Sequence, residues 1–162
     1  MFRIYARSAS LQGLPDLGIA IAGGTGNGLV SGLRPVYHFF QMMQMRAIEP
    51  LPATRFNFAS AIERAGMLGE KIAAMAAHRH PFGGLEERLL WFDQLPYLSL
   101  SRAAERRLLA DLAAQASTAH ENTAAALGLA RADELSAAGR SMEALVEVTR
   151  VYEAGVKAFD EQ

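Results

Sequence analysis

The chain has 162 residues, enough for one domain that buries a core without disulfide or metal support. Its 16 lysines and arginines balance 17 acidic residues, so no net field draws it to nucleic acid, and we expect no nucleic-acid partner. Cysteine is absent, which excludes thiol catalysis, thiolate metal sites and disulfides and is typical of a reducing, cytoplasmic location.

The first 50 residues are poor in charge. Their charged side chains are Arg3, Arg7, Asp16, Arg34, Arg46 and Glu49. Later segments carry acids and bases throughout, so we place a boundary near Pro50 and Pro52. Residues 1–53 are expected to form a glycine-rich N-terminal arm with one short amphipathic helix, and residues 54–162 a helical domain. The apolar run at 17–30 is broken by glycine and shorter than the roughly 20 residues that a membrane span takes, so no transmembrane segment is expected.

The sequence GGTGNG, at residues 23–28, follows the apolar sequence LGIAIA. Glycines let backbone N–H groups approach an anion at the start of a helix, as in phosphate loops. No Lys-Ser or Lys-Thr follows, the glycine spacing departs from the dinucleotide fingerprint, and we expect no series of strands after it. We therefore interpret the segment as a flexible loop or tight turn and expect no cofactor.

A short amphipathic helix is expected from Pro35, which suits a first helical position. Val36, Phe39, Phe40 and Met43 fall on one stripe of this helix. Methionine is flexible and polarisable, so these residues form either an adaptable binding surface or a part of the main core.

Apolar residues recur at spacings of three and four between residues 56 and 79, which predicts an amphipathic helix. This helix should end before Pro81, and Gly83 and Gly84 should make the turn. A shorter helix is predicted over 85–95, where Pro96 interrupts it.

The C-terminal third predicts two long helices. Ser99 or Ser101 can cap an alanine-rich helix that keeps helical spacing as far as Ala130. Gly139 favours a turn, after which Ser141 restarts the chain as a helix. In that last helix Leu145, Val148, Tyr152 and Phe159 share one face. The expected fold is therefore all-α: a bundle or extended array of three to four main helices, preceded by the N-terminal arm.

The histidines give no metal or catalytic motif. His38, His78, His80 and His120 are the whole supply. They include no Glu-x-x-His or His-x-x-x-His pair that could hold a metal from one helix face, and no G-x-S-x-G nucleophile motif occurs. We therefore expect no catalytic residue and no bound metal.

The C-terminal 40 residues resemble phasins, the helical proteins that coat polyhydroxyalkanoate storage granules. The resemblance is carried by an alanine-rich helix, a short turn, a serine-started helix and late aromatic residues: Ala137, Ala138, Arg140, Ser141, Glu143, Ala144, Tyr152 and Phe159. It implies amphipathic helices that close on themselves in water and spread on a hydrophobic surface.

The sequence thus favours a non-enzymatic helical interaction protein. We expect it to bind a hydrophobic polymer, a lipid surface or another protein. We expect a homo-oligomer or a larger assembly, because apolar helix faces need cover. The predicted interaction surface comprises Val36, Phe39, Phe40, Met43, Leu145, Val148, Tyr152 and Phe159. One alternative is a structural subunit of a virion or a secretion machine. Another is a small-molecule-binding enzyme that uses Gly26 or His80.

Overall fold

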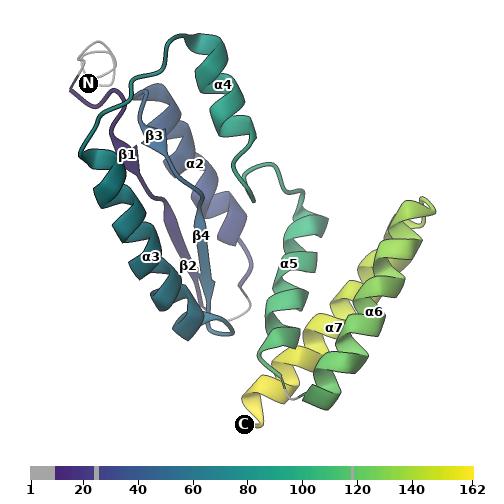
Figure 1. Cartoon of the computed structure of the whole chain (residues 1–162). Coiled ribbons are helices and arrows are strands. Elements are labelled where there is room, and N and C mark those ends of the chain that lie inside the picture. The colour runs from purple at the N-terminus through teal and green to yellow at the C-terminus, as the bar shows by residue number, and fades with distance from the viewer. Residues whose placement is uncertain (1–9, 24–25, 118) are drawn as a thin grey trace. The chain divides into compact units, whose positions relative to one another are not determined.

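The computed structural model describes residues 10–23, 26–117 and 119–162 (Figure 1). Within these residues the chain forms six helices and four short strands, so the all-α expectation is wrong. The chain divides into two compact units, which are described separately. The first unit comprises Met1–Gly23, Gly28–Ala53 and Phe58–Ser99, and the second comprises Gly24–Asn27, Thr54–Asn57 and Leu100–Gln162. The predicted boundary after residue 53 lies between two segments of the first unit.

The strands lie in the segment that was expected to be an arm. Strand β1 (Pro15–Asp16) pairs in parallel with β3 (Arg46–Ala47), and β2 (Ile19–Ala22) pairs with β4 (Leu51–Thr54). The structure thus has two small two-stranded sheets. β1 and β2 follow one another along the chain and form what we call the β1–β2 track, and β3 and β4 form the β3–β4 track beside it. Strands of parallel sheets are covered on both faces and therefore lack an apolar-polar alternation, so the sequence pattern did not reveal them.

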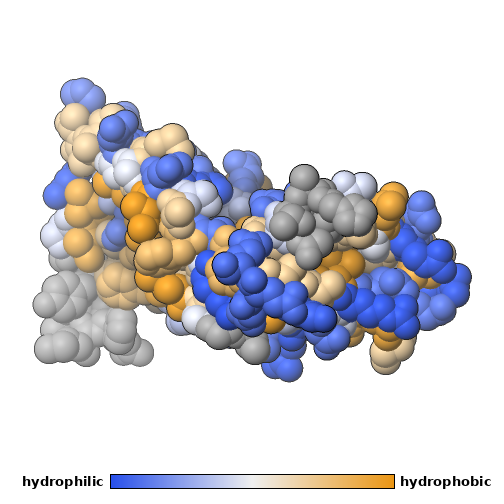
Figure 2. All heavy atoms as spheres, turned by 90° about the horizontal axis from the view of Figure 1, so that it is seen from below, coloured by the Kyte–Doolittle hydropathy of each residue, from blue (hydrophilic) through white to orange (hydrophobic). Residues whose placement is uncertain are grey.

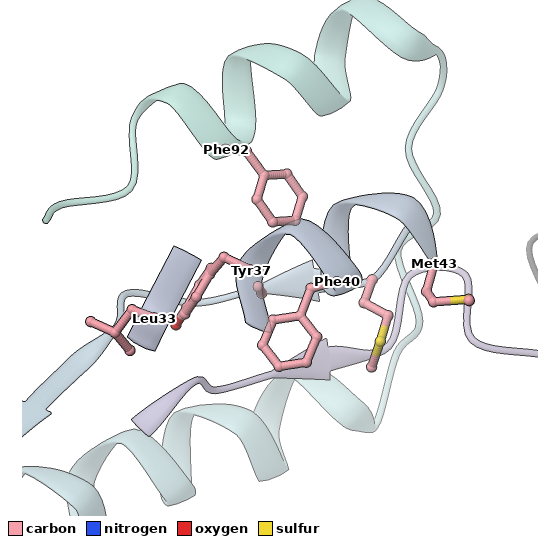
Figure 3. Packing of buried hydrophobic residues seen from close by; sticks show 7 residues of the cluster. Leu33, Tyr37, Phe40, Met43 and Phe92 are labelled. Atoms are coloured by element: carbon pink, nitrogen blue, oxygen red, sulfur yellow. The ribbon is translucent and has the colours of Figure 1, made fainter. Parts of the chain in front are cut away.

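Helices cover both faces of these strands. α2 (Leu29–Met42) lies on one face, α3 (Phe58–Ala76) on the other, and α4 (Leu85–Asp93) packs over α2 (Figure 3). The core on the α2 side consists of Leu33, Tyr37, Phe40, Met43, Met45, Ala47 and Phe92. The core on the α3 side consists of Ile48, Leu51, Ala53, Ala61 and Leu68. The helices predicted over 56–79 and 85–95 are thus present with slightly shorter bounds.

α2 begins six residues before Pro35, so the prediction that this proline opens the helix is wrong. Gly28 precedes the helix in a left-handed conformation with φ +89°. Leu29 and Val30, in the first turn, are almost completely buried. Burial of these two side chains stabilises the additional turns by about 3–6 kcal/mol. Proline inside a helix costs about 3 kcal/mol, so the burial is large enough to offset that cost.

The second unit is a bundle of α5 (Arg102–Gln115), α6 (Ala119–Ala137) and α7 (Ser141–Asp160). The predicted cap at Ser101 is confirmed, because its Oγ accepts a hydrogen bond of 3.2 Å from Ala104 N–H. The predicted turn at Gly139 is also confirmed, with φ +75°. The alanine-rich segment is not one helix, since α5 ends at residue 115 and α6 starts at 119.

One tyrosine connects the two tracks of strands in the first unit. The hydroxyl of Tyr37, on α2, accepts a hydrogen bond of 3.1 Å from Gly18 N–H and donates one of 2.8 Å to the carbonyl oxygen of Ile48. Burial raises the pKa of Tyr37 above its ordinary value, so the hydroxyl keeps the proton that it donates. A Cβ at residue 18 would lie 2.3 Å from Tyr37 Cε2, so glycine is required there.

We expect Tyr37→Phe to lower the free energy of unfolding by about 1–3 kcal/mol, because it leaves a buried N–H and a buried C=O without their partner. Urea denaturation followed by circular dichroism measures this change. Tyr97→Phe is the control, because the Tyr97 hydroxyl makes no hydrogen bond with the described residues. Equal midpoints for Tyr37→Phe and the unaltered protein would contradict the role of this hydroxyl.

Candidate interaction surface

The eight residues predicted to form an interaction surface divide between the two units. Phe40 and Met43 are buried in the core of the first unit, and Val148 and Tyr152 are buried in the second. Leu145 and Phe159 are half-buried. Val36 and Phe39 are exposed. These two residues of α2 are therefore the predicted ones that remain most open to a partner.

The outer edge of β2 is open. β2 pairs with β4 on one side, and no other strand among the described residues pairs with it. The carbonyls of Asp16 and Gly18 accept hydrogen bonds of 2.8 and 3.0 Å from Ile48 and Leu51 on the neighbouring track. Backbone groups alternate between the two sides of a strand, so the N–H and C=O groups of Ile19 and Ile21 point away from β4.

Ile19 and Ile21 also expose their side chains, by 49% and 70%. Ala20, between them, packs against the core on the α2 side. Side chains alternate between the faces of a strand, so both isoleucines lie on the face that carries α3. Their exposure means that α3 leaves both side chains largely uncovered.

The flank of α2 above this edge is uncharged. A Cβ at Gly32 would lie 3.9 Å from the Ala20 side chain, which places Gly32 over β2. Val36 and Phe39 follow Gly32 at spacings of four and three and therefore lie on the same flank of the helix. Both side chains are exposed.

The flank of α3 beside this edge is also uncharged. Glu49, between β3 and β4, accepts hydrogen bonds from Arg64 (3.3 Å) and Lys71 (3.2 Å), which fixes the flank of α3 that faces the β3–β4 track. Phe58 and Ile62 lie on the opposite flank, across the buried stripe of the helix, and are 50% and 59% exposed. That flank therefore faces the open edge of β2.

All three layers of the first unit thus expose apolar side chains on the same side. We call this the edge surface: Ile19, Ile21, Val36, Phe39, Phe58 and Ile62. None of these residues is charged. Figure 2 shows one face of the molecule, on which apolar residues gather over part of the first unit. Sequence reasoning missed Phe58 and Ile62 because it assigned both residues to the apolar stripe of the predicted helix. It missed Ile19 and Ile21 because it did not predict β2.

Two glycines lie in the middle of α3, on or near this flank. A Cβ added to Gly66 or Gly69 would meet nothing within 4 Å. Glycine inside a helix is less stable than alanine by about 1 kcal/mol. No described part of the chain requires glycine at either position. The absence of side chains there would let a neighbouring element approach this flank closely.

The other candidate sites have weaker support. Residues 23–28 come between β2 and α2, and β3 and β4 follow, contrary to the expectation that no series of strands comes after this segment. Residues 24–25 lie outside the described part. His80 lies after α3, and its backbone carbonyl accepts a hydrogen bond from Arg46. The His120 side chain is outside the described part. Among the described residues there is no group of three His, Asp or Glu suited to a metal ion, and no helix long and apolar enough to cross a membrane.

The Glu49 pairs predict a pH dependence of stability. The hydrogen bond from Lys71, assisted by Arg64, lowers the pKa of Glu49 below its ordinary value of 4.5. The folded state therefore gains stability from this carboxylate above pH 4.5 and loses it as the pH falls through the lowered pKa. Urea midpoints measured from pH 7 to pH 3 should fall more for the unaltered protein than for Glu49→Gln. Parallel curves would contradict the pairing.

We expect Gly66→Ala to raise the free energy of unfolding by about 0.5–1 kcal/mol, because alanine is the better helix former and the space is open. The matched control is Gly155→Ala in α7, where the new Cβ would lie 2.9 Å from the Cβ of Ala113. That variant should lose about 1–3 kcal/mol through overpacking. Thermal unfolding at low protein concentration measures both. A destabilised Gly66→Ala would show that this glycine serves the fold itself.

Comparisons of the chain with protein-family models, with curated proteins and with solved structures found no match.

Proposed function

We propose that this protein is a non-enzymatic structural subunit that assembles with other copies of itself through the edge surface. The observation that carries the proposal is the exposure of apolar side chains from a strand and two helices on one side of the first unit. The lack of cysteine fits an assembly in a reducing compartment such as the cytoplasm.

The composition of the edge surface favours self-association over adhesion to a charged partner. In a two-fold assembly the same patch meets itself, so any charge near the axis would meet a like charge. Homodimer interfaces are accordingly more apolar than the interfaces of transient complexes. The six residues of the edge surface carry no charge and meet this requirement.

Burial gives the driving force. Apolar area removed from water contributes about 25 cal/mol per Å², or about 1.5–3 kcal/mol for a large side chain that becomes fully buried. Soluble monomers rarely expose large contiguous apolar patches, and such patches mark interaction sites. When two copies meet through the edge surface, the six side chains of each copy become buried.

We expect Ile62→Lys to raise the dissociation constant of self-association about tenfold or more, because it places a charge in an apolar interface. Sedimentation velocity over a range of protein concentrations measures this change.

The matched control is Met67→Lys, on the same helix. Met67 is 63% exposed, close to the 59% of Ile62, but lies outside the edge surface. Its variant should associate like the unaltered protein. A chain that stays monomeric at every concentration, or an equal effect of both lysines, would overturn the proposal.

A further inference from the structure

We infer that two copies join by pairing their β2 edges in antiparallel orientation about a two-fold axis, so that the strands of both copies form one continuous sheet. This inference rests on the proposed self-assembly and specifies its geometry. The partner is a second copy of this chain, and the contact consists of backbone hydrogen bonds flanked by the edge surface.

The backbone of β2 fixes the register. A two-fold axis that relates neighbouring antiparallel strands stands perpendicular to the sheet and keeps each face of the sheet on its own side. Residues opposite one another must then point to the same face, so one residue of β2 faces its own copy. The outward N–H and C=O groups belong to Ile19 and Ile21. They are all used when Ile19 lies opposite Ile21 of the partner subunit and Ala20 lies opposite Ala20 of the partner subunit.

The helix layer fits this arrangement. Each copy brings two tracks of strands, about 4.8 Å apart, with one α3 across them on the same face. Two copies side by side would therefore place their α3 helices about 10 Å apart, which is the diameter of a helix and the usual distance between packed helices. The flanks that carry Ile62 and Gly66 then face each other, and the glycines allow a close approach.

The open edge carries none of the residue types that commonly prevent strand pairing. Residues 17–22, Leu-Gly-Ile-Ala-Ile-Ala, contain neither a charge nor a proline. β4, on the other track, contains Pro52, and all four of its residues are buried. The β2 edge is therefore the side of the sheet that can accept a strand.

Cysteine cross-linking tests the register, because the chain has no cysteine of its own. Ala20→Cys places two sulfurs across the axis, where the Cα atoms of such a pair lie about 4.5 Å apart, within disulfide range. Ala22→Cys is the matched control: it is half-buried like Ala20 and on the same face of the same strand. Its two copies would lie about 13 Å apart along the strands, too far to bond.

Under mild oxidation of the full-length protein, Ala20→Cys should double in mass on a non-reducing gel, and Ala22→Cys should stay a monomer. Ile62→Lys combined with Ala20→Cys should lose the cross-link. If the protein associates and Ile62→Lys weakens the association, but neither cysteine cross-links or both do so equally, the strand pairing is wrong and the proposed function stands. If the protein does not associate, the proposed function and this inference both fail.

Discussion

The arrangement of the first unit depends on the hydroxyl of Tyr37. It connects Gly18 on one track of strands to Ile48 on the other, from a helix that covers both. Two short parallel strands alone bury little area and form few hydrogen bonds, so they need a covering helix to hold their register. Because the donor and the acceptor are both backbone groups, the tyrosine fixes the tracks whatever their side chains are. Gly18 has no side chain because the Tyr37 ring occupies that space.

Further contacts secure the β3–β4 track. Arg46 lies over the rings of Phe82 and Trp91, with its Cζ atom 4.4 and 4.7 Å from the ring centroids, and pairs with Glu87. The Trp91 ring N–H donates a hydrogen bond of 2.8 Å to the carbonyl oxygen of Ala47. These contacts attach α4 to β3. The β1–β2 track has no comparable cover on its outer side among the described residues, and this asymmetry leaves one edge of the sheet open.

The second unit is held together by small residues. A Cβ at Gly155 would lie 3.0 Å from the backbone of Ala113, and one at Gly128 would lie 2.6 Å from a methyl group of Val151. Helices that approach this closely bury little area per side chain but make contact along their length. The aromatic rings of Phe56 and Phe159, 5.2 Å apart, add a larger apolar contact at one end of the unit.

The sequence by itself determined the helices α3, α4 and α7, the turn at Gly139 and a serine cap at residue 99 or 101, because periodicity, capping and left-handed glycine are local properties. It did not separate α5 from α6. It did not determine the strands, since parallel strands depend on distant partners and carry no alternation when helices cover both faces. Val36 and Phe39 were identified as surface candidates from the sequence, but Phe40 and Met43 on the same stripe were not distinguished from them. Only the tertiary structure decided which of these side chains are buried. The spacing of apolar residues predicts which face of a helix is apolar, but not how much of that face the neighbouring elements cover. The edge surface consists of the apolar side chains of β2, α2 and α3 that this packing leaves exposed.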